Sequence, residues 1–83
     1  MHFIIKGINM TLDLLENGEV AKISNFNVTE QLLERFFSLG LSRAKMVKKV
    51  GSTLGGSTIL IECDRICLML RSDEAKSIEV EKI

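Results

Sequence analysis

The chain has 83 residues, 46% hydrophobic and 27% charged, and its eleven basic and eleven acidic residues leave no net charge at pH 7. This length allows one small domain, and the composition is that of a folded protein rather than a disordered one. A balanced charge excludes the surplus of Lys and Arg that nucleic-acid binding requires. The apolar runs are far shorter than the roughly 20 residues of a membrane-spanning helix, so no membrane span is expected.

The segment before Met10 has no pattern that fixes its position. Residues 1–9 are interpreted as an N-terminal extension in which Phe3–Ile5 could form an additional strand. The start of the chain has neither a basic leader nor the apolar run of about 7–15 residues found in signal peptides. We therefore expect a cytoplasmic protein with one domain over residues 10–83.

The first part of this domain is expected to contain a turn and a strand. Thr11–Leu15 leads into Glu16–Glu19, where Asn and Gly favour the positive φ angles of a tight turn. A strand is predicted over Val20–Ser24, and it should end near the loop formed by residues 25–27.

One helix is predicted between this strand and Gly40, which stands where a left-handed C-terminal cap is common. Its N-cap is Asn27, paired with Glu30 in a capping box, or alternatively Thr29. Apolar residues at i, i+4 and i+7 mark the face expected in the core, namely Leu32, Phe36 and Leu39.

The rest of the chain alternates apolar and polar residues, which is typical of strands. Strands are predicted over Lys45–Val50, Thr58–Cys63, Ile66–Leu70 and Ser77–Glu81. They are separated by a flexible loop at Gly51–Ser57, a two-residue turn at Asp64 and Arg65, and a helical turn at Asp73–Ala75. Five to six short strands and one short helix predict a mostly β fold, a small and partly open barrel around one core.

The two-residue turn also predicts the state of the cysteines. If Cys63 pairs with Ile66 across the turn, Cys67 lies on the opposite sheet face, so Cys63 and Cys67 cannot form a disulfide. Both are expected to remain thiols.

The order and spacing of these segments are specific, although none of them is specific alone. They run through Met10–Leu14, Asn17–Ile23, Leu32–Leu41, Thr53–Ser57, Ile59-x-Ile61-x-Cys63, Leu68-x-Leu70-Arg71, Glu74-Ala75 and Ile78-x-Val80. This series resembles the FeoA family, small accessory proteins encoded with the bacterial ferrous iron transporter FeoB. The resemblance implies a Src-homology-3-type (SH3-like) barrel over about residues 10–80 that binds the cytoplasmic part of FeoB and supports iron uptake.

Three residues depart from the family pattern. Ala44 stands where the family usually has glycine, Ser57 replaces a loop proline, and Arg65 replaces the hairpin glycine. Arg65 argues against a positive φ angle in that turn, because non-glycine residues adopt such angles rarely.

The sequence offers little for catalysis, so the chain is not expected to be an enzyme. The lone histidine is His2, Cys63 and Cys67 lack a second ligand pair, and the loop at Gly51–Gly56 lacks the lysine of a phosphate-binding loop. No bound cofactor is expected. Weak Fe²⁺ binding by the acidic C-terminal part is an alternative that requires several convergent carboxylates, from Asp73, Glu74, Glu79 and Glu81.

The candidate partner surface is the flank of the helix. Leu33 and Phe37 widen the apolar stripe beyond what one barrel needs, and Arg35 lies beside them. Leu54 and Gly55, in the glycine-rich loop, are the next candidates. Alternatively, Leu33 and Phe37 could cover the barrel mouth or form a homodimer contact.

The residues also bear on two other kinds of binding module. A groove for proline-rich peptides needs several aromatic residues, and this chain has no Trp or Tyr. The alternative function is a regulatory or metal-sensing module like the FeoA-type domains attached to metal-dependent repressors. Those repressors carry a DNA-binding helix-turn-helix on the same chain, and 83 residues are not expected to hold one.

Overall fold

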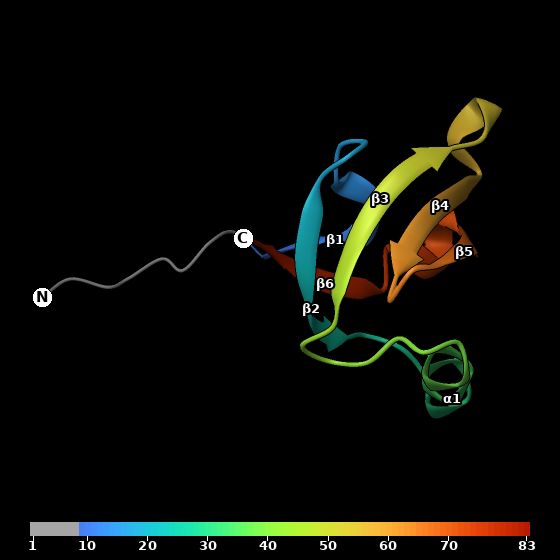
Figure 1. The fold of residues 1–83 in the computed structure, drawn as a ribbon. Helices are drawn as coiled ribbons and strands as arrows, with labels where there is room; N and C mark the ends of the chain where they lie inside the picture. The colour runs from blue at the N-terminus through green and yellow to red at the C-terminus, as the bar shows by residue number, and fades with distance from the viewer. Residues whose placement is uncertain (1–8) are drawn as a thin grey trace, which may run out of the picture.

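The computed structural model describes residues 9–83, and the interpretation of Phe3–Ile5 as a strand lies outside these residues. Within this described part, six strands, two helices and two short 3₁₀ turns follow one another (Figure 1). In order they are β1 (Asn9–Thr11), η1 (Leu12–Leu14), β2 (Val20–Phe26), α1 (Glu30–Ser38), β3 (Met46–Ser52), η2 (Leu54–Gly56), β4 (Thr58–Cys63), β5 (Ile66–Arg71), α2 (Ser72–Ala75) and β6 (Ile78–Lys82).

The strands form one antiparallel sheet in the order β1-β6-β2-β3-β4-β5. The sheet curls, so that β2 and β3 lie in front of β1 and β6 in Figure 1. Register shifts interrupt β2 between Ile23 and Asn25 and β3 between Lys49 and Gly51. Such bulges increase local twist and help a short sheet to bend. The result is the expected small, partly open barrel with mostly β structure.

The concave side of the sheet encloses one hydrophobic core. Alternate residues of each strand point inward, as in β4, where Ile59, Ile61 and Cys63 are buried while their neighbours are partly exposed. In residues 10–83 no polar or charged residue is buried. Fourteen residues make up the buried cluster: Leu12, Leu15, Ala21, Ile23, Phe36, Leu41, Val47, Ile59, Ile61, Cys63, Leu70, Ala75, Ile78 and Val80.

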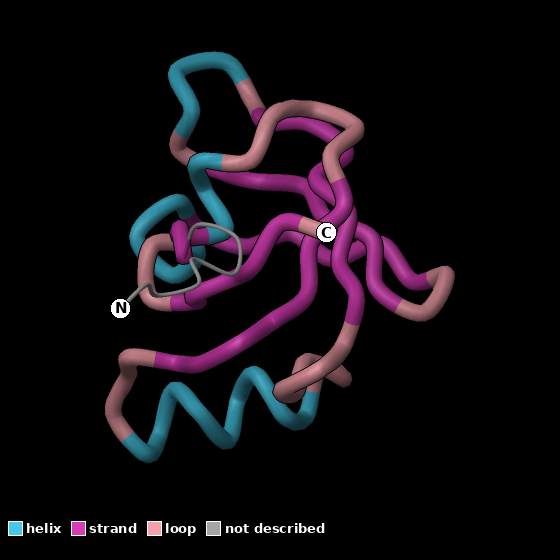
Figure 2. Tube along the Cα trace, turned by 90° about the vertical axis from the view of Figure 1, so that its left-hand side faces the viewer, coloured by secondary structure: helices cyan, strands magenta, loops and turns pink. Residues whose placement is uncertain are grey.

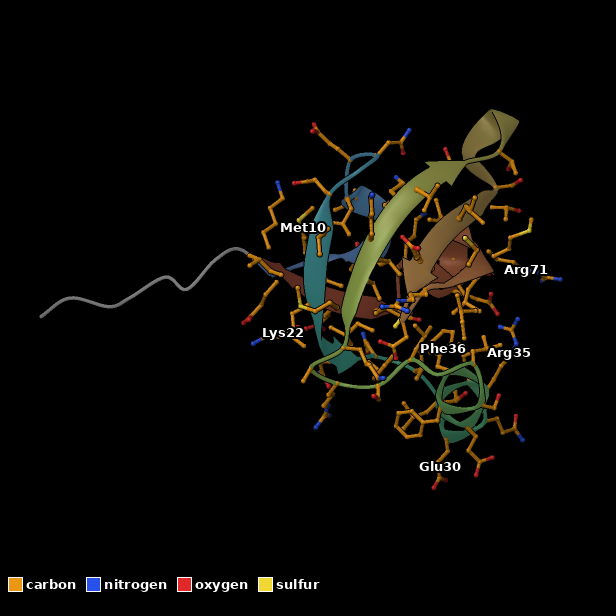
Figure 3. All side chains as sticks on the ribbon, viewed as in Figure 1. Met10, Lys22, Glu30, Arg35, Phe36 and Arg71 are labelled. Carbon is orange, nitrogen blue, oxygen red and sulfur yellow. The ribbon has the colours of Figure 1, made fainter. Side chains whose placement is uncertain are left out.

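Helix α1 lies at one end of the barrel, and Phe36 is on the side that faces the sheet while Glu30 is on the far side (Figure 3). The N-cap is Thr29, whose hydroxyl accepts a hydrogen bond from the amide of Leu32 at 3.4 Å. The preference for Asn27 was wrong, because the backbone of Asn27 is instead tied to the C-terminal part, with its amide donating to the carbonyl of Ser77 at 2.8 Å. Of the three residues expected in the core, Phe36 is fully buried and Leu32 and Leu39 are only partly buried.

The hairpin between β4 and β5 has the predicted register. Cys63 pairs with Ile66 and Glu62 with Cys67, and both cysteines are free, Cys63 buried and Cys67 exposed. Burial raises the pKa of the Cys63 thiol, and the nearby carboxylate of Asp64 adds to this. The doubt about a positive φ angle was wrong, since φ is 54° at Asp64 and 68° at Arg65. Two-residue hairpins of this kind match the sheet twist only when both central residues adopt such angles.

The loop between β3 and β4 is shorter and more regular than expected. Gly51 and Ser52 belong to β3, and residues 54–56 form the 3₁₀ turn η2, in which Gly55 has a φ angle of 85°. The amide of Gly56 donates to the carbonyl of Thr53 at 2.9 Å, and the amide of Thr53 donates to the carbonyl of Thr58 at 3.0 Å.

Replacing Arg65 with glycine is expected to stabilise the protein by about 0.5–1 kcal/mol. A left-handed backbone costs a non-glycine residue about 1–2 kcal/mol, and the greater chain entropy of glycine when unfolded offsets about half of that. The midpoint of thermal unfolding should therefore rise by a few degrees. Arg65→Lys keeps the cost of the left-handed backbone, so it should leave the unfolding midpoint unchanged. A lower midpoint for Arg65→Gly would show that the arginine makes a compensating contact.

Candidate functional site

A groove opens between α1, the end of β2 and the loop that joins α1 to β3. Its volume is about 470 Å³, and it is lined by Phe26, Leu33, Phe37, Ser42 and Arg43. Three of these are apolar and come from two different elements. A groove of this size has room for a few apolar side chains of a ligand or partner.

Phe26 links the groove to the core. Its ring lies 5.8 Å from that of Phe36 in a tilted arrangement and 5.9 Å from that of Phe37, edge to face at 89°. Aromatic pairs prefer tilted and edge-to-face geometries of this kind. Phe36 is fully buried, whereas 51% of Phe37 is exposed. The aromatic side chains therefore extend from the core to a surface where Phe37 is held in place without being covered.

The polar part of the groove comes from the loop after α1. The Nη2 atom of Arg43 donates to Oδ1 of Asn25 at 2.8 Å, and in residues 9–83 no carboxylate forms a salt bridge with Arg43. Two backbone hydrogen bonds hold the loop to β2. The amide of Ala44 donates to the carbonyl of Ile23 at 2.8 Å, and the amide of Ile23 donates to the carbonyl of Lys45 at 2.9 Å. The φ angle of Ala44 is 72°, which explains why glycine would suit this position. Among these described residues, the positive charge of Arg43 thus lies beside an apolar floor without a salt-bridge partner.

The structure brings together two of the five candidate residues, Leu33 and Phe37. Arg35 lies on another side of α1 and forms a salt bridge with Glu74 of α2. Leu54 and Gly55 belong to η2, at the end of the molecule opposite α1 in both Figure 1 and Figure 2. One partner of ordinary size could contact both Leu33 and Phe37, but its interface would not extend to η2.

Sequence reasoning missed Phe26, Ser42 and Arg43. Phe26 follows the predicted end of its strand, and Ser42 and Arg43 occupy a loop without a motif. The available signal was that Phe26 is one of only four Phe residues in the chain.

The acidic residues of the C-terminal part do not converge. In the described part of the chain no group of three or more His, Cys, Asp or Glu side chains could hold a metal ion. Glu74 is engaged by Arg35, and its other carboxylate oxygen accepts the amide of Arg71 at 3.0 Å. His2 lies outside the described residues. Between residues 9 and 83 there is no helix long and apolar enough to cross a membrane.

Comparisons with known proteins identify the family. The FeoA domain model matches residues 10–82. A Campylobacter jejuni protein named Fe(2+) transport protein A is 46% identical over 74 residues, which are 89% of this chain and 100% of that protein. The NMR structure of FeoA from Chlorobium tepidum has a TM-score of 0.84 and 27% identity, over 89% of this chain and 70% of that one.

The same fold occurs in a manganese-dependent transcriptional repressor, with a TM-score of 0.85 and 18% identity. The match covers 96% of this chain but 45% of the repressor, and at this identity it shows a shared fold only. The family model and the Campylobacter relative both span nearly all of the described chain. On this basis the chain belongs to the FeoA domain family, the accessory proteins of ferrous iron transport.

Proposed function

We propose that this protein is a non-enzymatic cytoplasmic accessory protein that binds the cytoplasmic part of the FeoB ferrous iron transporter and modulates it. The observation that carries the proposal is the groove beside α1, where Phe37 is 51% exposed although its ring packs against Phe26, which in turn packs against the buried Phe36. An accessory protein without a reaction of its own acts through a binding surface. Membership of a ferrous iron transport family makes the transporter the natural partner.

The groove has the features of a protein interaction site. Interface hot spots are enriched in aromatic residues and arginine, and they lie in pockets from which the partner excludes water. Phe37 and Arg43 provide one of each on adjacent elements, and Leu33 provides the apolar floor. We therefore propose Leu33, Phe37 and Arg43 as the main contacts, with Arg35 positioning α1 through its salt bridge with Glu74. Leu54 and Gly55 are proposed only as a second surface.

Replacing Phe37 with alanine tests this proposal. The partner would lose an anchor side chain, so affinity for the purified cytoplasmic domain of the cognate FeoB should fall at least about tenfold. Titration calorimetry in the absence of iron measures this directly. Stability should fall by only about 1 kcal/mol, the value of one edge-to-face aromatic pair.

Leu14→Ala is the matched control, because Leu14 is also apolar and exposed, at 61%, but lies in η1, away from the groove. It should bind like the unchanged protein. If Phe37→Ala binds as tightly as Leu14→Ala, the groove is not the transporter site. If the unchanged protein does not bind the cytoplasmic domain at all, the adaptor function itself is wrong.

The second candidate is a regulatory or metal-sensing module, which the shared fold with the manganese-dependent repressor favours. Titration with Fe²⁺ and Mn²⁺ distinguishes the two functions. An adaptor binds the transporter domain equally well with and without metal. A metal-sensing module takes up metal and changes its affinity for its partner when it does so.

A further inference from the structure

The edge of the sheet at β5 is a second surface, independent of the groove. β5 is the last strand in the sheet order, and among residues 9–83 it pairs only with β4. An edge strand presents unpaired backbone groups to which another extended chain can add. The exposed fractions are 56% for Ile66 and 62% for Met69, and Cys67 is also exposed.

The hairpin register shows which backbone groups of β5 are free. In a two-residue hairpin the residues that flank the turn, here Cys63 and Ile66, exchange both hydrogen bonds, and such pairs alternate with pairs that exchange none. Ile66 and Leu68 therefore direct their amides and carbonyls toward β4. Cys67 and Met69 direct theirs away from the sheet.

Two further hydrogen bonds agree with this alternation. The amide of Ser72 donates to the carbonyl of Ser57 at 3.0 Å, as expected for the next hydrogen-bonded pair beyond β5. The amide of Arg71 faces away from β4 and donates instead to the carboxylate of Glu74 at 3.0 Å. Glu74 thus closes the edge at Arg71, and the open edge consists of Cys67 and Met69.

The charged residues beside Cys67 and Met69 indicate which kind of extended segment could pair with this edge. Arg65 and Arg71 flank Cys67 and Met69, and in residues 9–83 neither arginine forms a salt bridge. In a twofold-symmetric dimer that uses both free positions, Met69 of each copy would lie opposite Cys67 of the other. Arg65 of each copy would then lie opposite Arg71 of the other. Like charges directly opposite one another destabilise a strand pair. An occupant with acidic ends would instead form two favourable pairs.

We propose that β5 binds an extended segment of a partner protein that pairs antiparallel with Cys67 and Met69 and carries an acidic residue at each end. Small apolar side chains at the two positions opposite Cys67 and Met69 would cover Met69 on the outer sheet face. This site lies outside the groove and does not depend on the transporter, so either proposal can fail alone.

The probe is a capped peptide of the sequence Glu-Thr-Val-Thr-Val-Thr-Glu, titrated into ¹⁵N-labelled full-length protein. In antiparallel register its two Val residues lie opposite Met69 and Cys67 and its Glu residues opposite Arg71 and Arg65. The amide signals of Cys67 and Met69 should shift, with fast exchange between free and bound forms. The matched control peptide carries N-methyl groups on both Val residues, which removes the two donors and keeps every side chain. Its affinity should be at least about tenfold lower.

Met69→Pro is the matching change in the protein. Proline removes the outward amide of residue 69 without removing a hydrogen bond to β4, so the hairpin should persist while peptide affinity falls at least about tenfold. Met69→Thr keeps that amide and should retain binding. The proposal is overturned if the N-methylated peptide binds as tightly, if no β5 signal shifts at millimolar peptide, or if the β5 signals shift with protein concentration alone, which would identify a second copy as the occupant.

Discussion

Replacing Phe36 with alanine is expected to destabilise the protein by about 3–5 kcal/mol, the usual cost of removing a buried aromatic side chain. Phe36 has no exposed surface, and its ring packs against that of Phe26. It is also the only fully buried residue of α1, so it joins the helix to the core. Denaturant unfolding should show the loss directly. For a domain of this size the total stability is only about 5–15 kcal/mol, so much of it should disappear.

Phe37→Ala is the internal control for this prediction. The two residues are adjacent and chemically identical, but Phe37 is half exposed and Phe36 is buried. The cost at Phe37 should be about 1 kcal/mol, from the lost contact with Phe26. Equal losses at the two positions would mean that α1 is rotated relative to the arrangement described above.

Leu41→Ala is expected to cost about 2–5 kcal/mol, as do other leucines truncated in a close-packed core. Leu41 is fully buried just after α1. The amide of Leu41 donates to the carbonyl of Phe36 at 3.0 Å, and the amide of Gly40 donates to the carbonyl of Phe37 at 3.0 Å. Gly40 has a φ angle of 93°. This is the helix ending in which the second residue after the cap packs against the last turn of the helix.

The same change tests how closely the loop after α1 is packed against the core. Leu41 immediately precedes Ser42 and Arg43, which line the groove. Unfolding should therefore begin at lower denaturant concentration for Leu41→Ala, and Leu14→Ala should leave the transition almost unchanged because Leu14 is exposed. A loss below about 1 kcal/mol would show that the loop can collapse into the space left by the leucine.

The sequence was sufficient to predict strands β2 to β6, because most of them alternate clearly, whereas the three-residue strand β1 (Asn9–Thr11) was not predicted. The bounds of β4 agree with the prediction at both ends, and the pairing of Cys63 with Ile66 follows from the two-residue turn. Phe36 was also predicted correctly, since helical spacing places it at the centre of the apolar stripe. These features depend on residues close together in the chain.

The features that could not be predicted depend on tertiary contacts. The choice between Thr29 and Asn27 as cap was decided by a hydrogen bond from Asn27 to Ser77, fifty residues away in sequence. The positive φ angle of Arg65 was imposed by the twist of the paired strands, against the preference of the residue. Two of the five residues that line the candidate site, Leu33 and Phe37, were found from sequence, because both lie on the helix. Phe26 and Arg43 join them only when β2 and the loop after α1 are folded together.

The most direct test of the proposed adaptor function is to map the contact surface on the ¹⁵N-labelled protein during titration with the cytoplasmic domain of FeoB. The amides of Leu33, Phe37 and Arg43 should lose intensity or shift first, and those of η2 should change little. Changes confined to Leu54–Gly56 or to β5, with the groove amides unaffected at saturation, would contradict the assignment of the groove as the transporter-binding site.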